Sequence, residues 1–194
     1  MCSGCRDGRK LGPRCTGGQL GRTGGFTIVE VLVAMAIILV LAGLILATSS
    51  YVSNKGARSR AEVEIAAMSA ALENYKTDNG VYPIDTSVDA TVNSDPGVYA
   101  AASLTLYEAL SGDADNDSGR NAETTSYMSF KPNQLAPADA TQKVTFMKDP
   151  FGNSYGYSTI CQADPAKGYN PTFDLWSTAG AIGDSGKAGW IKNW

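Results

Sequence analysis

The sequence contains no histidine among its 194 residues. This absence excludes a Ser-His-Asp triad, a Cys-His dyad, HExxH zinc chemistry and any acid–base step that depends on an imidazole. Basic residues are also few, with 16 Lys and Arg against 19 Asp and Glu and a net charge of −3. A basic face that could neutralise phosphates is not indicated, so nucleic acid is not an expected partner. Since no other acid–base constellation is apparent, we do not expect an enzyme.

Cysteine is scarce outside the N-terminal end. Of the four cysteines, only Cys161 lies in the body of the chain; the others are Cys2, Cys5 and Cys15. Those three could supply three zinc ligands, but a fourth with suitable spacing is absent. Reduced thiols in a disposable segment are therefore the preferred interpretation. Cys161 has no second cysteine in the body with which to pair, and we predict that it is a small residue within a strand.

Charge is distributed unevenly along the chain. The first 25 residues hold five of the 16 basic residues but one of the 19 acidic ones, so the head is basic and the remainder acidic. Between them lies an apolar run from Phe26 to Ala47 whose single charge is Glu30. As a helix rising 1.5 Å per residue, a run of this length reaches about 33 Å, enough to cross a bilayer core. The basic end is expected in the cytoplasm and the acidic body outside.

Three interpretations of the apolar run compete. A secretory signal peptide cut after Ala47 would have the bulky Ile45 at the −3 position and an unusually long apolar region. A simple signal-anchor helix explains the length and the orientation, but it leaves Glu30 unexplained, because a carboxylate in an apolar helix is costly. The third interpretation accounts for Glu30 and for the residues that precede it.

Residues 24–30, Gly-Gly-Phe-Thr-Ile-Val-Glu, resemble the processing site of type IV prepilin-like proteins. The resemblance implies that residues 1–25 are a leader, which a prepilin peptidase removes by cutting between Gly25 and Phe26. It also implies N-methylation of Phe26. Glu30 becomes the fifth mature residue, and it could neutralise the terminal ammonium of a neighbouring subunit in lipid during assembly.

Beyond the membrane run, the pattern predicts that the helix continues to about Gly80. No proline occurs between Phe26 and Tyr82, and one apolar stripe follows the helical period: Ala61, Ile65, Met68, Leu72 and Tyr75. The sequence Asp-Asn-Gly at 78–80, followed by Pro83, is a stop signal. We assign residues 26–47 to a transmembrane and polymerisation half of this helix and residues 48–80 to an amphipathic half.

Residues 81–194 are predicted to form a periplasmic globular domain. A helical piece is expected near 100–111 and strand-like runs at 143–147, 154–160 and 172–177. Three such strands make a small antiparallel sheet, which the amphipathic half of the helix can cover. The predicted class is α+β with a pilin fold, in which the segment at about 84–142 is a variable insertion and residues 143–194 hold the C-terminal strands.

A closer resemblance lies in three segments that are similar to the major, G-type pseudopilins of type II secretion systems. These segments are Leu72–Pro83, Asp149–Tyr157, and Phe173–Ser177 together with Ile191–Trp194. The resemblance implies a single-pass protein of the bacterial inner membrane that polymerises into a periplasmic pseudopilus. Its implied partners are its own copies, other pseudopilins, the prepilin peptidase, the inner-membrane assembly platform and membrane lipid.

The alternative is a type IV pilin or a DNA-uptake minor pilin that displays a binding surface. The lone Cys161 favours the pseudopilin, because surface pilins more often close a C-terminal disulfide loop.

The same resemblance implies calcium in the loop before the terminal Ile-x-Asn-Trp. Here that loop keeps a single carboxylate, Asp184, with Ser177 as a neutral ligand, which would make a weak site for a hard cation. A second candidate is the run of Asp113, Asp115 and Asp117, whose acids alternate as in an EF-hand loop. Its glycine comes one position late, and Thr124 stands where a bidentate Glu is needed. A solvated acidic turn is the preferred interpretation of that run.

Overall fold

The computed structural model describes residues 25–113, 115 and 117–194, so the three N-terminal cysteines and most of the predicted leader lie outside the described residues. The chain divides into two units, Met1–Leu46 and Ala47–Trp194. Helix α1 (Ile28–Asn79) contributes to both. In the first unit, residues 25–46 are exposed and helical from Ile28 onward. Within the described ranges, α1 is the one helix whose length and composition would allow it to cross a membrane.

In the second unit, α1 buries the predicted apolar stripe. Ala61, Ile65, Met68 and Leu72 are each no more than 4% exposed, and Tyr75 is half-buried. The helix ends at Asn79, where Gly80 takes φ +79° and its amide donates to the carbonyl of Lys76 at 2.7 Å. A glycine in this left-handed conformation satisfies the last carbonyls of a helix at no steric cost. The predicted stripe and the predicted end of the helix are both confirmed.

The strands form two small antiparallel sheets. Sheet β3-β4-β5 consists of β3 (Gly156–Ser158), β4 (Asp174–Ser177) and β5 (Ile191–Lys192), with Gly156 opposite Trp176 and Ser177 opposite Ile191. The second sheet pairs β1 (Leu135–Ala136) with β2 (Phe146–Met147). An α+β arrangement of a long helix and a small antiparallel sheet is therefore confirmed.

Two details of the strand prediction were wrong. The run at 143–147 does not join the three-stranded sheet, because the Thr145 amide donates to the carbonyl of Ala136 at 2.7 Å and so ties this run to β1. The third strand is β5 instead. Cys161 is buried and free, but it lies in the 3-10 helix Ile160–Gln162 and not in a strand. The chain leaves the sheet after Ser158, where the Thr159 amide donates to the carbonyl of Asp85 at 2.7 Å.

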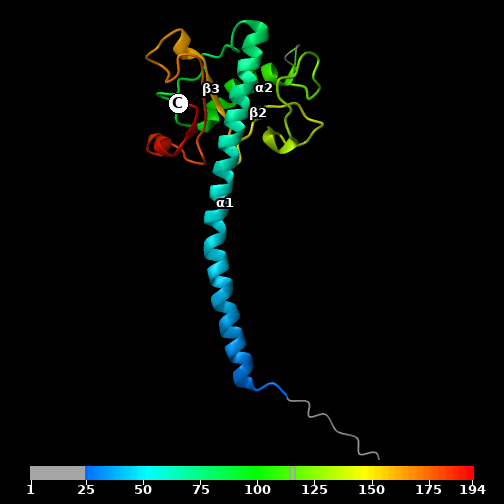
Figure 1. Cartoon of the computed structure of the whole chain (residues 1–194), viewed down its shortest axis with the longest axis vertical. Helices are drawn as coiled ribbons and strands as arrows, with labels where there is room; N and C mark the ends of the chain where they lie inside the picture. The colour runs from blue at the N-terminus through cyan, green and yellow to red at the C-terminus, as the bar shows by residue number, and fades with distance from the viewer. Residues whose placement is uncertain (1–24, 114, 116) are drawn as a thin grey trace, which may run out of the picture. The chain divides into compact units, whose positions relative to one another are not determined.

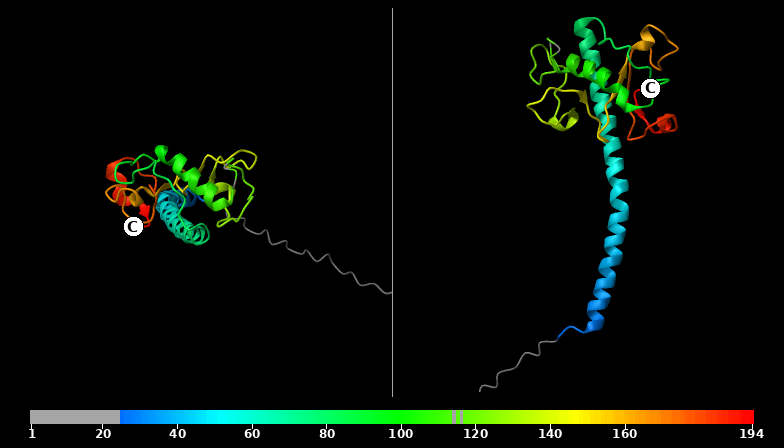
Figure 2. Two further views of the ribbon diagram at one scale, coloured as in Figure 1. Left: turned by 90° about the horizontal axis from the view of Figure 1, so that it is seen from above. Right: turned by 180° about the vertical axis from the view of Figure 1, so that it is seen from behind.

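The segment 84–142 is part of the domain core. It contains the 3-10 helix Pro96–Tyr99 and helix α2 (Ala100–Ser111), which packs against β2 and β3. Four side chains of α2 belong to the main hydrophobic cluster: Ala102, Leu106, Tyr107 and Leu110. Within this unit α2 lies behind α1, with the C-terminal sheet and the loops of 117–142 on opposite sides of α1 (Figures 1 and 2). Part of this segment is therefore indispensable to the core.

A polar link joins α1 to the sheet region. The hydroxyl of Tyr155, 2% exposed, donates to Glu64 Oε2 at 2.5 Å, and Gln134 Nε2 donates to Glu64 Oε1 at 3.1 Å. Burial and the neighbouring carboxylate of Glu64 raise the pKa of Tyr155, so this hydroxyl remains a donor. The link ties the second-unit part of α1 to Tyr155 and Gln134.

We expect Tyr155→Phe to lower the free energy of unfolding by about 1–3 kcal/mol, because Glu64 loses a donor in a water-poor position. Denaturant unfolding followed by far-UV circular dichroism would measure the change. Tyr51→Phe is the control, since Tyr51 is 71% exposed. Equal unfolding midpoints for Tyr155→Phe and the parent would contradict a stabilising hydrogen bond between Tyr155 and Glu64.

Candidate processing segment and candidate metal sites

The peptide bond between Gly25 and Phe26 lies in a short non-helical segment directly before α1. Phe26 is 80% exposed. A Cβ built on Gly25 would meet no atom within 4 Å, so the fold itself does not require glycine there. A protease that binds an extended backbone could therefore reach this bond, and any need for glycine would come from the protease.

Thr27 and Glu30 form the beginning of α1. The Glu30 amide donates to Thr27 Oγ1 at 3.2 Å, so Thr27 caps the first turn, and Glu30 is the acidic residue of that turn. Thr-x-x-Glu is the spacing of a capping box, and a carboxylate near a helix N-terminus is stabilised by the helix dipole. Sequence reasoning named Glu30 but missed the cap, although the Thr-x-x-Glu spacing signals it.

The apolar surface that follows is uncovered. The large hydrophobic side chains of residues 26–46 are between 46% and 80% exposed. A surface of this extent on a protein in water marks contact with a membrane or with other protein chains. The first unit therefore needs lipid or other apolar helices around it.

The predicted C-terminal ligands have separate partners. Ser177 is fully buried, and its hydroxyl donates to Asp149 Oδ2 at 2.5 Å. Asp149 Oδ1 also accepts the amides of Phe151 at 3.0 Å and Asn153 at 2.8 Å. Burial raises the pKa of Asp149, against these hydrogen bonds. Both oxygens of this carboxylate are thus engaged in holding the turn after β2 against β4.

Asp184 lies in the 3-10 helix Asp184–Gly189, and its side chain is 78% exposed. Its Oδ1 atom forms an ion pair with Lys187 Nζ at 3.0 Å. The Lys187 ammonium, with a smaller contribution from Ser94, holds the pKa of Asp184 below its ordinary value. With one carboxylate already paired to an ammonium and with Ser177 turned to Asp149, this loop does not fit a calcium ion, which prefers six to eight oxygen ligands.

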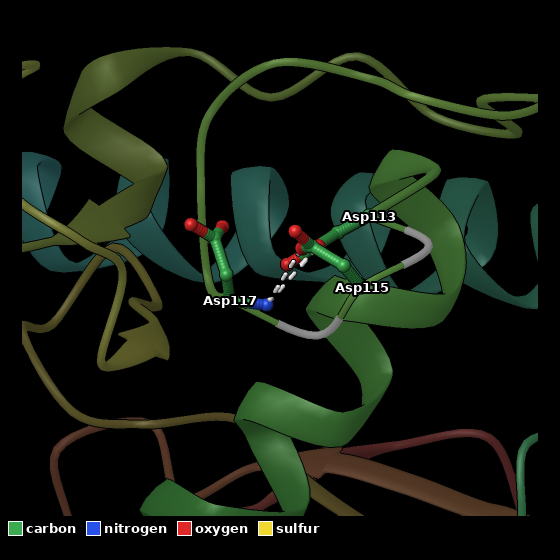
Figure 3. Close-up of side chains that lie close together, drawn as sticks. All are labelled: Asp113, Asp115 and Asp117. Carbon is green, nitrogen blue, oxygen red and sulfur yellow. Dashed lines mark hydrogen bonds between the residues drawn. The ribbon is translucent and has the colours of Figure 1, made fainter.

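The acidic turn is the one group of three potential metal-ligating side chains in the part of the chain that the structure describes (Figure 3). One carboxylate oxygen from each of Asp113, Asp115 and Asp117 lies within 4.8 Å of the other two. The amide of Asp117 donates to Asp113 at 3.3 Å and to Asp115 at 3.1 Å. The amide of Ser118 donates to Asp113 at 2.8 Å.

Further contacts of this turn are also made between protein groups. Asp117 forms a salt bridge with Lys143 at 3.2 Å, and this ammonium lowers the pKa of Asp117. Thr124, at the twelfth position of the EF-hand pattern, bonds to the carbonyl of Gly112 through its amide at 3.0 Å and its hydroxyl at 3.2 Å. Asp117 is thus paired with Lys143, and Thr124 supplies no carboxylate at the position where an EF-hand has its bidentate glutamate.

Comparisons with known proteins converge on one family. The model described as the prokaryotic N-terminal methylation motif matches residues 21–46, which include Gly25, Phe26 and Glu30. The type II secretion system core protein G of Vibrio cholerae is 30% identical over 173 residues, which cover 88% of this chain and 90% of the relative.

Two shorter matches carry the same description. The core protein G of Aeromonas hydrophila is 37% identical over 76 residues, covering 39% of this chain and 53% of the relative. That of Pectobacterium carotovorum is 39% identical over 67 residues, covering 34% and 43%. No solved structure matches the chain.

Proposed function

The chain belongs to the type II secretion system core protein G family, the major pseudopilins, and from this membership we propose a specific life cycle for it. It is made as a prepilin, cleaved between Gly25 and Phe26, N-methylated at Phe26 and polymerised into a pseudopilus through residues 26–47. The observation that carries the proposal is an exposed non-helical Gly25–Phe26 bond placed directly before an uncovered apolar helix.

The charge pattern supports an orientation for the inserted protein. The basic residues of segment 1–25 would stay on the cytoplasmic side of the inner membrane, where the peptidase acts. Residues 48–80 would leave the bilayer as the amphipathic half of α1, and residues 81–194 would fold in the periplasm. We propose this topology for a single-pass protein.

We propose that assembly uses the apolar surface of α1 in the first unit. The apolar residues of the first unit can exchange lipid for the same surface on other copies, which allows an open polymer of identical contacts. The partners that we propose are further copies, other pseudopilins and an inner-membrane assembly platform. The work of the subunit is structural, as is usual for this family, and needs no catalytic group.

Processing is the direct test. We expect the membrane-extracted protein from cells with the secretion system to begin at Phe26 and to carry one methyl group. Intact-mass measurement and N-terminal sequencing check both points. A cut after Ala47, or retention of residues 1–25, would contradict the proposed life cycle.

Gly25→Val should leave the full-length form in the membrane, because a β-branched side chain obstructs close approach of the peptidase to the backbone. A Cβ at this position has open space around it, so the change should not disturb the fold of the chain itself. Gly43→Val is the matched control: it lies in the same apolar run with equally open surroundings, and it should be cleaved.

A further inference from the structure

The ammonium of Lys187 lies between two loops that are far apart in sequence. Lys187 Nζ donates to the carbonyl oxygen of Thr91 at 2.8 Å and pairs with Asp184 Oδ1 at 3.0 Å. It also lies 5.7 Å from the centroid of the Trp190 ring. A lysine ammonium has three N–H donors. The carbonyl, the carboxylate and the π face of the indole together provide one acceptor for each of them.

The burial of this ion pair is one-sided. The side chain of Lys187 is 23% exposed, whereas that of Asp184 is 78% exposed. An ammonium withdrawn from water is costly unless nearby acceptors replace the lost water. The Thr91 carbonyl is held in place for this role, because Asp89 Oδ1 accepts the Thr91 amide at 2.8 Å and its hydroxyl at 2.5 Å. The Asp89 side chain therefore holds Thr91 in a position where its carbonyl can accept from Lys187.

A second cationic contact holds the loop between β4 and β5, which contains Lys187. Arg58 Nη1, on α1, donates to the carbonyl of Gly189 at 2.8 Å. The amide of Gly183 also donates to the carbonyl of Ser94 at 3.4 Å. The loop between β4 and β5 is thus attached to α1 and to the 89–94 segment by contacts that side chains and backbone supply.

We propose that, in the C-terminal loop between β4 and β5 (residues 178–190), the Lys187 ammonium takes the place of the calcium ion that the family resemblance implies. A carboxylate and a backbone carbonyl are oxygen donors of the kind that a hard divalent cation uses. Here they converge on an ammonium that the chain carries itself. The C-terminal loop should therefore keep its fold without calcium. This proposal rests on the loop and does not depend on the proposed processing or assembly.

The test compares thermal unfolding of the full chain in detergent, in millimolar calcium and in chelator. Near-UV circular dichroism is a suitable signal, because Trp190 stacks on Trp176 at 6.0 Å and so reports on the loop. We expect the same Tm for the parent in both conditions. Lys187→Met, which keeps the aliphatic stem, should melt lower by about 2–6 °C in both conditions. Lys192→Met is the control, since Lys192 is exposed and lies 4.9 Å over the Trp194 ring; it should melt close to the parent.

Three other results are possible, and each distinguishes between Lys187 and a calcium ion in this loop. A calcium-dependent rise in Tm that Asp184→Ala abolishes would place the ion in this loop and overturn the proposal. Lys187→Met melting with the parent would overturn it as well. A rise that Asp115→Ala abolishes, while Lys187→Met still melts low, would place an ion at the acidic turn and leave Lys187 as the cation of the C-terminal loop.

Discussion

Gly156→Ala is expected to prevent the periplasmic domain from reaching its native packing. A Cβ at this position would lie 2.1 Å from Cε2 and 2.3 Å from Cζ2 of Trp176, the residue opposite it in the sheet. Trp176 is fully buried, stacks on Trp190, and contacts Tyr99 edge-on with ring centroids 5.1 Å apart. Because the buried indole packs against these rings, we expect the added methyl group to displace either the strand or the core.

The expected cost is large relative to the stability of a domain. Overpacking a core by a methylene typically costs about 1–3 kcal/mol, occasionally more. Here the overlap is with a rigid ring at the centre of an aromatic cluster, so we expect the loss to consume most of the roughly 5–15 kcal/mol that a domain of this kind has. Near-UV circular dichroism should lose its tryptophan signal, and limited proteolysis should degrade residues 81–194.

Gly189→Ala is the matched control for this experiment. A Cβ at Gly189 would meet no atom within 4 Å, so the variant should retain the native spectrum. If Gly156→Ala instead melted within one or two degrees of the parent, the close packing of Trp176 on β3 would be wrong.

Local patterns predicted the helices because their information is local. The stripe from Ala61 to Leu72 repeats every three or four residues, and Asn79-Gly80 ends α1 as the stop signal indicates. The predicted piece at 100–111 is α2 with the same bounds. Helical periodicity is thus enough to define α1 and its buried face, whereas for α2 the local pattern gave the bounds but not the buried face.

The sheets were harder to predict because their contacts are long-range. β5 has two residues and gives no alternation to detect, and β2 pairs with β1 instead of the other predicted strands. The tie between Lys187 and Thr91 joins residues 96 apart, and no spacing along the chain signals it. The same limit applied to Ser177, a ligand candidate by resemblance, whose actual partner Asp149 lies 28 residues away.

Glu30→Ala is expected to leave insertion and cleavage intact but to reduce polymerisation by at least about tenfold. Under the proposed life cycle, cleavage creates an α-ammonium on Phe26 within apolar surroundings. Removing its carboxylate partner leaves a charge unpaired in lipid, which is far more costly than in water. Chemical crosslinking in membranes should show monomers where the parent shows a ladder of oligomers.

The structure also offers a purely local role for Glu30, because it lies in the first turn of α1 beside the cap formed by Thr27. Two variants separate the roles. Glu30→Gln keeps a polar side chain at this turn but removes the charge, so it should assemble as poorly as Glu30→Ala if pairing with a neighbour is what matters. Thr27→Val removes the capping oxygen, worth about 1 kcal/mol, and keeps the charge, so it should form nearly normal ladders. Normal ladders from Glu30→Gln together with defective ones from Thr27→Val would assign Glu30 to the helix start and refute the pairing of subunits through this carboxylate.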